Sequence, residues 1–168
     1  MRKVMRAKKG VGLAANQVGL KHRFFVDKTK VYINPTLEPI DQELVEGREG
    51  CLSLPGGIYL MKRWRAVRLT YTDTQGRQVT EEARIPTKIR TLKDQAELTR
   101  CLMFQHEMDH LNGQLICDLG KVLKSQVERV VDEKERRFDP RKIPVVSLDQ
   151  LQHHIAAERS KRLREQGQ

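Results

Sequence analysis

The feature that most constrains this chain is the pattern His-Glu-x-x-His at residues 106–110. It lies in a stretch, residues 92–111, where apolar side chains recur every three or four positions, which predicts a helix. Residues four apart share one face of a helix, so His106 and His110 are both expected to reach one metal ion. Glu107 follows the first histidine and is placed to act on a water molecule beside that ion. This arrangement is typical of metal-dependent hydrolases.

Two histidines leave the ligand set incomplete, because catalytic metal sites normally have three protein ligands. The familiar extension that adds a third histidine fails here, since Ile116 occupies that position. A downstream carboxylate is one alternative, with Glu128 and Glu133 as candidates, although a solvated helix face explains both residues better. A cysteine thiolate is another. The residues alone leave this choice open.

The cysteines also indicate the compartment. Cys51, Cys101 and Cys117 are odd in number and form no Cys-x-x-Cys pair, so we expect no disulfide scaffold and favour a reducing cytoplasm. Cys101 and Cys117 are expected to pack against apolar neighbours. Cys51 is instead flanked by turn-forming residues, in the sequence Glu-Gly-Cys-Leu-Ser.

Composition narrows the class of protein. A chain of 168 residues can form one domain with a core, and it has no run of eighteen apolar residues that could cross a membrane. Residues 1–10 lack the apolar segment and cleavage site of a secretory signal. The net charge of +10 lies at the ends: residues 1–30 carry nine Lys and Arg against one acid, and residues 121–168 carry twelve against eight. Such basic flanks suit a polyanionic partner.

Apolar runs and turn signals predict the remaining elements. Strands are expected at residues 24–26, 31–33, 67–72 and 79–85, and helices at residues 3–9, 92–111, 121–137 and 148–164. Turns are expected at Gly76, which joins two strands as a hairpin, and at the Pro-Gly-Gly of residues 55–57. The predicted fold is α+β, with antiparallel strands surrounding the helix that carries the two histidines and a further C-terminal helix.

Three segments resemble, in order and rough spacing, the signature motifs of the peptide deformylase family. They are Gly-Val-Gly-Leu-Ala-Ala-Asn-Gln at residues 10–17, Glu-Gly-Cys-Leu-Ser at residues 49–53 and Gln-His-Glu-Met-Asp-His at residues 105–110. The resemblance covers residues 1–137 as a catalytic domain and leaves residues 138–168 as a basic, partly helical extension. It implies an enzyme that removes the formyl group from the formyl-methionine of new polypeptides and releases formate.

The resemblance also implies the metal site. Cys51, His106 and His110 would hold one divalent ion, and Glu107 would act as the general base. Two histidines and a cysteine accept Fe(II), Zn(II), Ni(II) or Co(II), and the family favours Fe(II).

By the same resemblance, the side-chain amide of Gln17 and the backbone N–H of Leu52 would donate hydrogen bonds to the developing oxyanion. An extended peptide needs close backbone approach and an apolar pocket for its methionine side chain. The residues expected to bind the substrate are Val11, Gly12, Gly50, Leu102 and Met103.

The chain departs from the family at its start, because only nine residues precede Gly10. We therefore expect an amino terminus shortened relative to the family.

Two other functions stay open: a general His-Glu-x-x-His metallopeptidase that uses Glu128 or Glu133, and a ribosome- or RNA-associated module without activity. The expected partners are formylated nascent peptides and, through the basic termini, the ribosome. We expect no membrane partner and no sequence-specific nucleic acid, since no aromatic-interleaved RNA motif is present.

Overall fold

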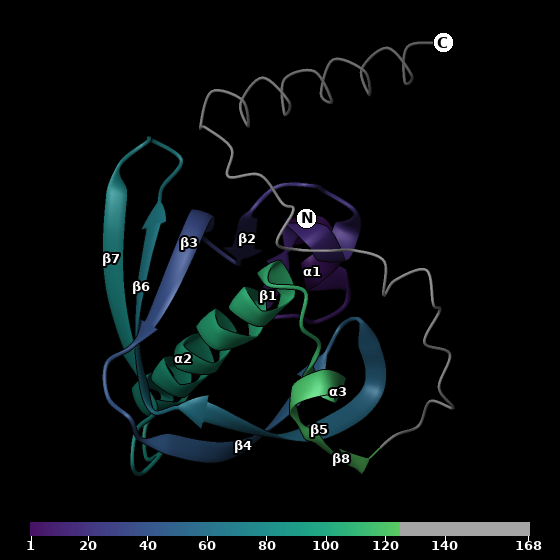
Figure 1. The fold of residues 1–168 in the computed structure, drawn as a ribbon, viewed down its shortest axis with the longest axis vertical. Coiled ribbons are helices and arrows are strands. Elements are labelled where there is room, and N and C mark those ends of the chain that lie inside the picture. The colour runs from purple at the N-terminus through teal and green to yellow at the C-terminus, as the bar shows by residue number, and fades with distance from the viewer. Residues whose placement is uncertain (125–168) are drawn as a thin grey trace.

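One long helix, α2 (Leu92–Leu111), runs between two antiparallel sheets (Figure 1). The structure is a computed structural model, and it describes residues 1–124. The larger sheet has the order β1-β2-β3-β6-β7, formed by β1 (Gly12–Ala14), β2 (Phe24–Asp27), β3 (Val31–Pro39), β6 (Ala66–Thr72) and β7 (Gln78–Arg84). The smaller sheet has the order β4-β5-β8, formed by β4 (Leu44–Cys51), β5 (Leu54–Trp64) and β8 (Lys121–Lys124). The predicted α+β fold is confirmed.

The helix α2 begins and ends at the predicted residues. At its start, the Thr91 side chain accepts a hydrogen bond from the backbone N–H of Asp94 at 3.1 Å. The Asp94 carboxylate accepts one from the backbone N–H of Thr91 at 2.9 Å, which completes a capping box. At its end, Gly113 adopts a φ of +72°, a conformation that glycine reaches at little cost. Local sequence signals therefore fix both ends of the helix.

The main core lies between α2 and the larger sheet. Phe104 of the helix packs against Phe25 and Tyr32 of the sheet, with ring centroids 6.3 and 5.5 Å apart. Cys101 is fully buried on the same side, as predicted, and its thiol lies 3.5 Å from the carbonyl oxygen of Ala83. Burial of each large apolar side chain contributes about 1.5–3 kcal/mol. This packing fixes the rotation of α2 and thereby the direction of its opposite face.

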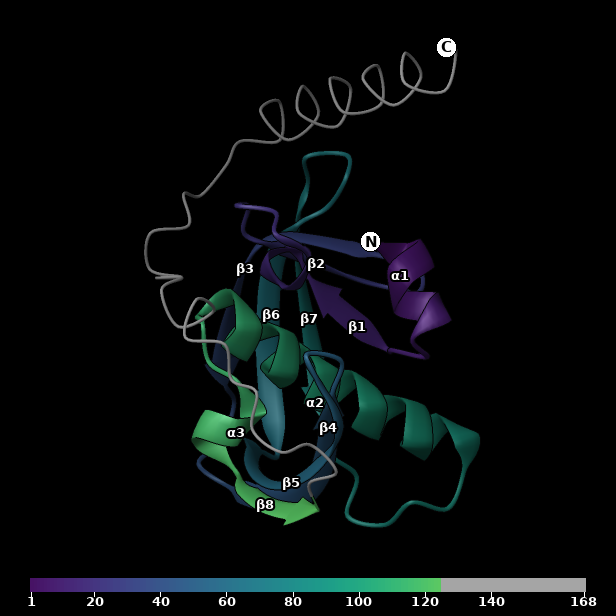
Figure 2. The ribbon, with the colours of Figure 1, turned by 90° about the vertical axis from the view of Figure 1, so that its right-hand side faces the viewer.

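A second apolar cluster fixes the N-terminal segment. The helix α1 (Arg2–Ala7) lies beside β1 in Figure 2, and its Met5 is fully buried together with Leu13 of β1. The 3-10 helix η1 (Ala15–Val18) follows β1 directly. No helix among residues 1–124 is long and apolar enough to cross a membrane.

The turn predicted at residues 55–57 is wrong. These residues belong to β5, and the chain instead reverses at residues 52–53, where Cys51 pairs with Leu54. The register of β4 and β5 shifts at this point, between the pairs Glu49–Tyr59 and Cys51–Leu54, and Gly56 adopts a positive φ of +81° within the strand. The reversal leaves Cys51 at the end of β4.

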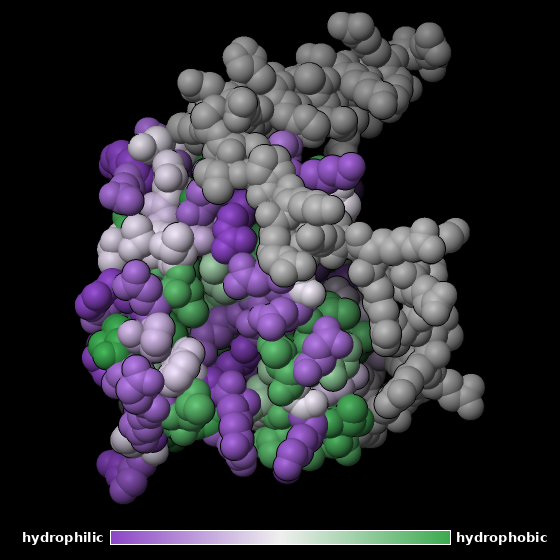
Figure 3. All heavy atoms as spheres, viewed as in Figure 1, coloured by the Kyte–Doolittle hydropathy of each residue, from purple (hydrophilic) through white to green (hydrophobic). Residues whose placement is uncertain are grey.

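The prediction of a helix from residue 121 is wrong at its start. Lys121–Lys124 forms β8, which pairs with β5, and the rest of the predicted helix lies outside the described residues. Val122 and Leu123 remain 55% and 48% exposed, and Figure 3 shows apolar side chains gathered over β8 and α3 (Ile116–Leu119). Pairing with the edge of β5 favours a strand here, and it outweighs the helical spacing of the apolar residues. The predicted helix at 148–164 and the domain boundary at residue 137 also lie outside the described residues.

Candidate metal centre

Three donor atoms from β4 and α2 converge at one point. The Sγ atom of Cys51 lies 3.2 Å from Nε2 of His110, which lies 3.2 Å from Nε2 of His106. All three atoms are within 4.8 Å of one another. Bonds of about 2.0–2.3 Å to a tetrahedral metal place neighbouring donors about 3.4 Å apart. The donor set therefore fits a divalent metal ion.

The sequence left the third donor open, and the fold brings Cys51 to the two histidines. Cys51 ends β4, and the chain reverses directly after it. The rival candidates Glu128 and Glu133 lie outside the described residues.

The cluster favours a thiolate. Burial alone raises the pKa of the Cys51 thiol, but hydrogen bonds from His106 and His110 outweigh it and hold that pKa well below its usual range. For His106, burial lowers the pKa, whereas contacts with Cys51 and Glu49 raise it above its usual range. The thiolate is the form of cysteine that binds metals, and a metal ion that binds here would displace the proton that these contacts hold on His106.

A carboxylate behind the cluster orients His106. The Nδ1 atom of His106 lies 2.9 Å from Oε2 of Glu49, and Arg63 binds the same carboxylate through Nε at 2.7 Å and Nη2 at 2.9 Å. Arg63 also contacts Asp109 at 2.5 Å. Because Nδ1 faces Glu49, Nε2 is the nitrogen of His106 that faces the other donors and would bind a metal ion.

Sequence reasoning assigned no role to Glu49 or Arg63. The sequence holds a signal, because Arg63 continues the alternate positions of Tyr59 and Met61, and the structure shows that all three residues are buried on β5. A charged residue in a buried register needs a partner of opposite charge.

The amide of Gln17 faces the same cluster. Its Oε1 atom accepts a hydrogen bond from the backbone N–H of Ala14 at 2.9 Å, which fixes the direction of the amide. Its Nε2 atom lies 3.0 Å from Nε2 of His110 and 3.1 Å from Oγ of Ser53. Leu52 follows Cys51 and lines the same pocket. Both predicted oxyanion donors therefore lie beside the donor cluster.

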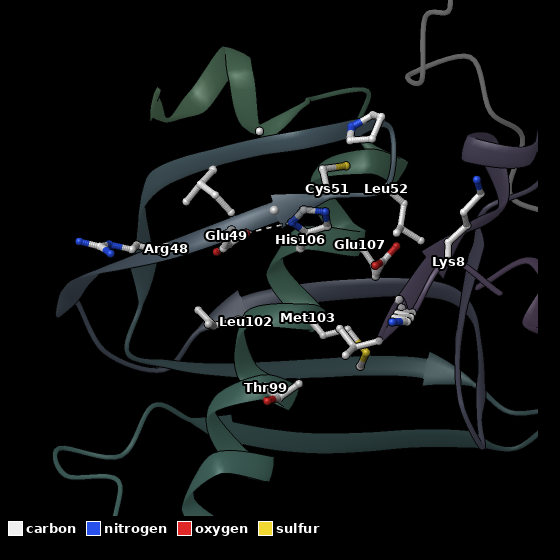
Figure 4. Close-up of a pocket in the computed structure, with 18 of the residues that line it drawn as sticks. Lys8, Arg48, Glu49, Cys51, Leu52, Thr99, Leu102, Met103, His106 and Glu107 are labelled. Carbon is white, nitrogen blue, oxygen red and sulfur yellow. Dashed lines mark hydrogen bonds and ion pairs between the residues drawn. The ribbon is translucent and has the colours of Figure 1, made fainter. Parts of the chain in front are cut away.

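The carboxylate of Glu107 is buried next to these groups (Figure 4). The residue is 3% exposed, and its Oε2 atom has no hydrogen-bond partner among residues 1–124. Burial raises the pKa of this carboxyl to about 8, although the nearby His106 opposes the rise. Gly12 leaves room for it, since a Cβ there would lie 2.9 Å from both Cδ of Glu107 and Cγ of Met103. A carboxyl of this kind is suited to exchanging a proton near neutral pH.

A pocket of about 860 Å³ opens beside the cluster. It is lined by all five residues that the sequence predicted to bind the substrate: Val11, Gly12, Gly50, Leu102 and Met103. Two of its walls are strands at sheet edges, because within residues 1–124 β1 pairs only with β2 and β4 pairs only with β5. Open strand edges can bind an extended peptide through main-chain hydrogen bonds.

Comparison with known proteins identifies the family. The family model for polypeptide deformylase matches residues 1–126, a span that holds every residue of the cluster. The chain belongs to the polypeptide deformylase family. A peptide deformylase from Saccharophagus degradans is 37% identical over 135 residues, which cover 76% of this chain and 71% of the relative. One from Thermotoga maritima is 40% identical over 113 residues, 65% of this chain and 61% of the relative.

Solved structures of deformylases agree with this assignment. The crystal structure of peptide deformylase from Thermotoga maritima has a TM-score of 0.60 and 37% identity, and covers 71% of this chain and 75% of that chain. The deformylase from the Vibrio parahaemolyticus bacteriophage VP16T, in complex with actinonin, has a TM-score of 0.57 and 33% identity, and covers 69% and 78%. Family membership and the Cys51, His106 and His110 cluster together support a divalent metal.

Proposed function

We propose that this chain is a peptide deformylase, which hydrolyses the formyl group from the formyl-methionine of newly made polypeptides and releases formate. One observation carries the proposal. In a chain of this family, Cys51, His106 and His110 bring three metal donors together beside the buried carboxylate of Glu107, in a pocket with two open strand edges. The residue roles that follow are part of the proposal.

The substrate binds as an extended chain along β1 and β4. Val11, Leu102 and Met103 line the apolar part of the pocket and receive the methionine side chain. Gly12 and Gly50 lie on the two edge strands, and their lack of side chains permits close approach of the peptide backbone. This places the formyl carbon beside the donor cluster and Glu107.

The ligand set would hold a divalent ion, which when bound polarises a carbonyl oxygen and lowers the pKa of water toward neutrality. Glu107 accepts a proton from the attacking water at Oε2 and delivers it to the amine nitrogen as the carbon–nitrogen bond breaks. The Gln17 amide and the Leu52 N–H donate to the oxyanion. A donor of this kind contributes about 3–4 kcal/mol to transition-state stabilisation.

We propose Fe(II) as the working ion. Two imidazoles and one thiolate also accept Zn(II), Ni(II) and Co(II), so metal content measured after purification in air would not identify it. Anaerobic purification followed by metal analysis and reconstitution with each ion tests this choice, and higher activity with Zn(II) than with Fe(II) would contradict it.

The experiment that tests the function measures bound metal and formate release from a formyl-methionyl peptide in the same anaerobic preparation. We expect about one metal per chain, lost in Cys51→Ala and retained without activity in Glu107→Ala. Cys117→Ala is the matched control, because Cys117 is a half-buried cysteine outside the donor set. Metal binding that is indifferent to Cys51, or full activity in Glu107→Ala, would refute the assignment.

The general metallopeptidase is not favoured, because Cys51 already supplies a third donor and the chain belongs to the deformylase family.

Cytoplasmic location and contact with the ribosome through the basic termini remain part of the proposal. Replacement of Arg159, Arg162 and Arg164 by Gln in the full chain should weaken co-sedimentation with ribosomes. Unchanged co-sedimentation would exclude a docking role for these residues.

A further inference from the structure

The pocket has a basic mouth. Three exposed cations line it: Lys8, Lys9 and Arg48. Figure 4 shows Lys8 on one side of the pocket and Arg48 on the other, with the donor cluster and Glu107 between them. Among residues 1–124, none of the three forms an ion pair. A ligand that enters the pocket therefore passes between unneutralised positive charges.

The acidic residues of the pocket do not offset these cations. Only two line it within the described part of the chain, Glu49 and Glu107. Glu49 is 8% exposed, and its carboxylate is bound by Arg63. Glu107 is 3% exposed and lies at the inner end beside His106. The charge that an incoming peptide meets at the mouth is therefore positive.

The two lysines are held in place by the backbone. They lie just beyond α1, where Lys9 adopts a φ of +57°, a left-handed conformation that is uncommon for residues other than glycine. A hydrogen bond of 2.8 Å from the N–H of Gly10 to the carbonyl of Met5 closes this turn. Gly10 packs closely against Leu52, since a Cβ there would lie 2.7 Å from the Leu52 side chain. The basic turn is thus fixed against the Leu52 side of the pocket.

We infer that this mouth selects formylated peptides that carry Asp or Glu at the second to fourth positions. The inference rests on the proposed function, which places the formyl group at the donor cluster and the methionine side chain in the apolar pocket. An extended chain advances about 3.3 Å per residue, so the next residues leave through the mouth. Their carboxylates would meet Lys8 and Lys9 on one side and Arg48 on the other.

The test compares formyl-Met peptides that differ only in having Glu, Gln or Lys at position two, three or four. Exposed charge pairs contribute modestly, so attraction and repulsion together predict kcat/KM about five- to twentyfold higher for Glu than for Lys, with Gln between them. The difference should lie mainly in KM and shrink as salt is raised, because the charges are exposed. Equal kcat/KM for the three peptides at every position would overturn the inference.

Variants assign the preference to the mouth. Lys8→Gln/Lys9→Gln and Arg48→Gln should each lower the Glu-to-Lys ratio while the Gln peptide keeps its kcat. The matched control is Lys21→Gln/Lys62→Gln, which removes two exposed lysines outside the pocket. An equal loss in the control would assign the preference to overall surface charge and overturn the inference.

A separate measurement distinguishes this inference from the proposed function. If no peptide releases formate, the proposed function fails. Binding of fluorescently labelled peptides, followed by anisotropy, still reports the preference. We expect Kd for the Glu peptide to be lower than Kd for the Lys peptide by the same factor as in kcat/KM. Equal Kd values for Glu and Lys peptides would overturn the inference, whatever the activity.

Discussion

The Nδ1 atom of His106 lies 2.9 Å from the carboxylate of Glu49, and this contact determines which nitrogen of His106 faces Cys51 and His110. Glu49 is itself held by Arg63 through two hydrogen bonds, of 2.7 and 2.9 Å. The donor cluster thus depends on a buried charge pair that binds no metal.

We predict that Glu49→Gln weakens metal binding about 10–100-fold, because the amide no longer fixes the proton on Nδ1 of His106. Metal affinity measured by competition with a chelator checks this. Glu46→Gln is the control, since Glu46 is exposed on the same strand. Thermal unfolding of both variants shows whether loss of the Arg63 partner also destabilises the fold. Unchanged affinity in a folded Glu49→Gln protein would contradict the orienting role.

Gln17→Ala should lower kcat about 10²–10³-fold, since it removes one donor to the oxyanion. Metal content should stay near that of the unmodified protein, because Gln17 is outside the three-donor set. Steady-state kinetics and metal analysis on the same sample separate the two effects. Gln114→Ala removes an exposed amide and should change neither. A Gln17→Ala protein that loses its metal would instead make Gln17 a structural support of the cluster.

Gly12→Ala should reduce kcat at least about tenfold, because small displacements of a catalytic group are costly. A Cβ at this position would lie 2.9 Å from Cδ of Glu107 and would push the carboxylate from its place. Gly47→Ala is the matched control on a strand, since a Cβ there has no atom within 4 Å. Equal kinetics of the two variants would show that Glu107 tolerates the shift.

Asp27→Asn should destabilise the fold in a pH-dependent way. Burial raises the pKa of this carboxyl, but hydrogen bonds from the backbone N–H groups of Lys30 and Thr29 and from the Tyr32 hydroxyl outweigh it and hold the pKa below its usual range. A lowered folded-state pKa gives stability that is present above the unfolded value and is lost as pH falls through the folded value.

The difference in Tm between the unmodified protein and Asp27→Asn should therefore be largest near pH 6–7 and shrink below about pH 4. Thermal unfolding across this range checks it. Glu38→Gln, an exposed residue on β3, should show little difference at any pH. A Tm difference that is independent of pH would mean that the charge of Asp27 contributes nothing.

Local sequence signals were sufficient where an element is stabilised by its own residues. The bounds of α2 followed from its apolar period, and the hairpin of β6 and β7 followed from alternation around Gly76. The same signals failed where pairing with a distant strand decided the outcome. Residues 121–124 form a strand because the edge of β5 is available for pairing, and residues 55–57 lie in β5 where its register with β4 shifts.

The sequence by itself determined that His106 and His110 share one face of a helix, since their spacing of four follows from helical geometry. Only the tertiary structure decided that Cys51 lies 3.2 Å from His110 and that Glu49 and Arg63 stand behind His106. The same holds for the basic turn of Lys8 and Lys9 at the pocket mouth. These relationships join residues far apart in the chain, and local periodicity carries no information about packing between distant segments.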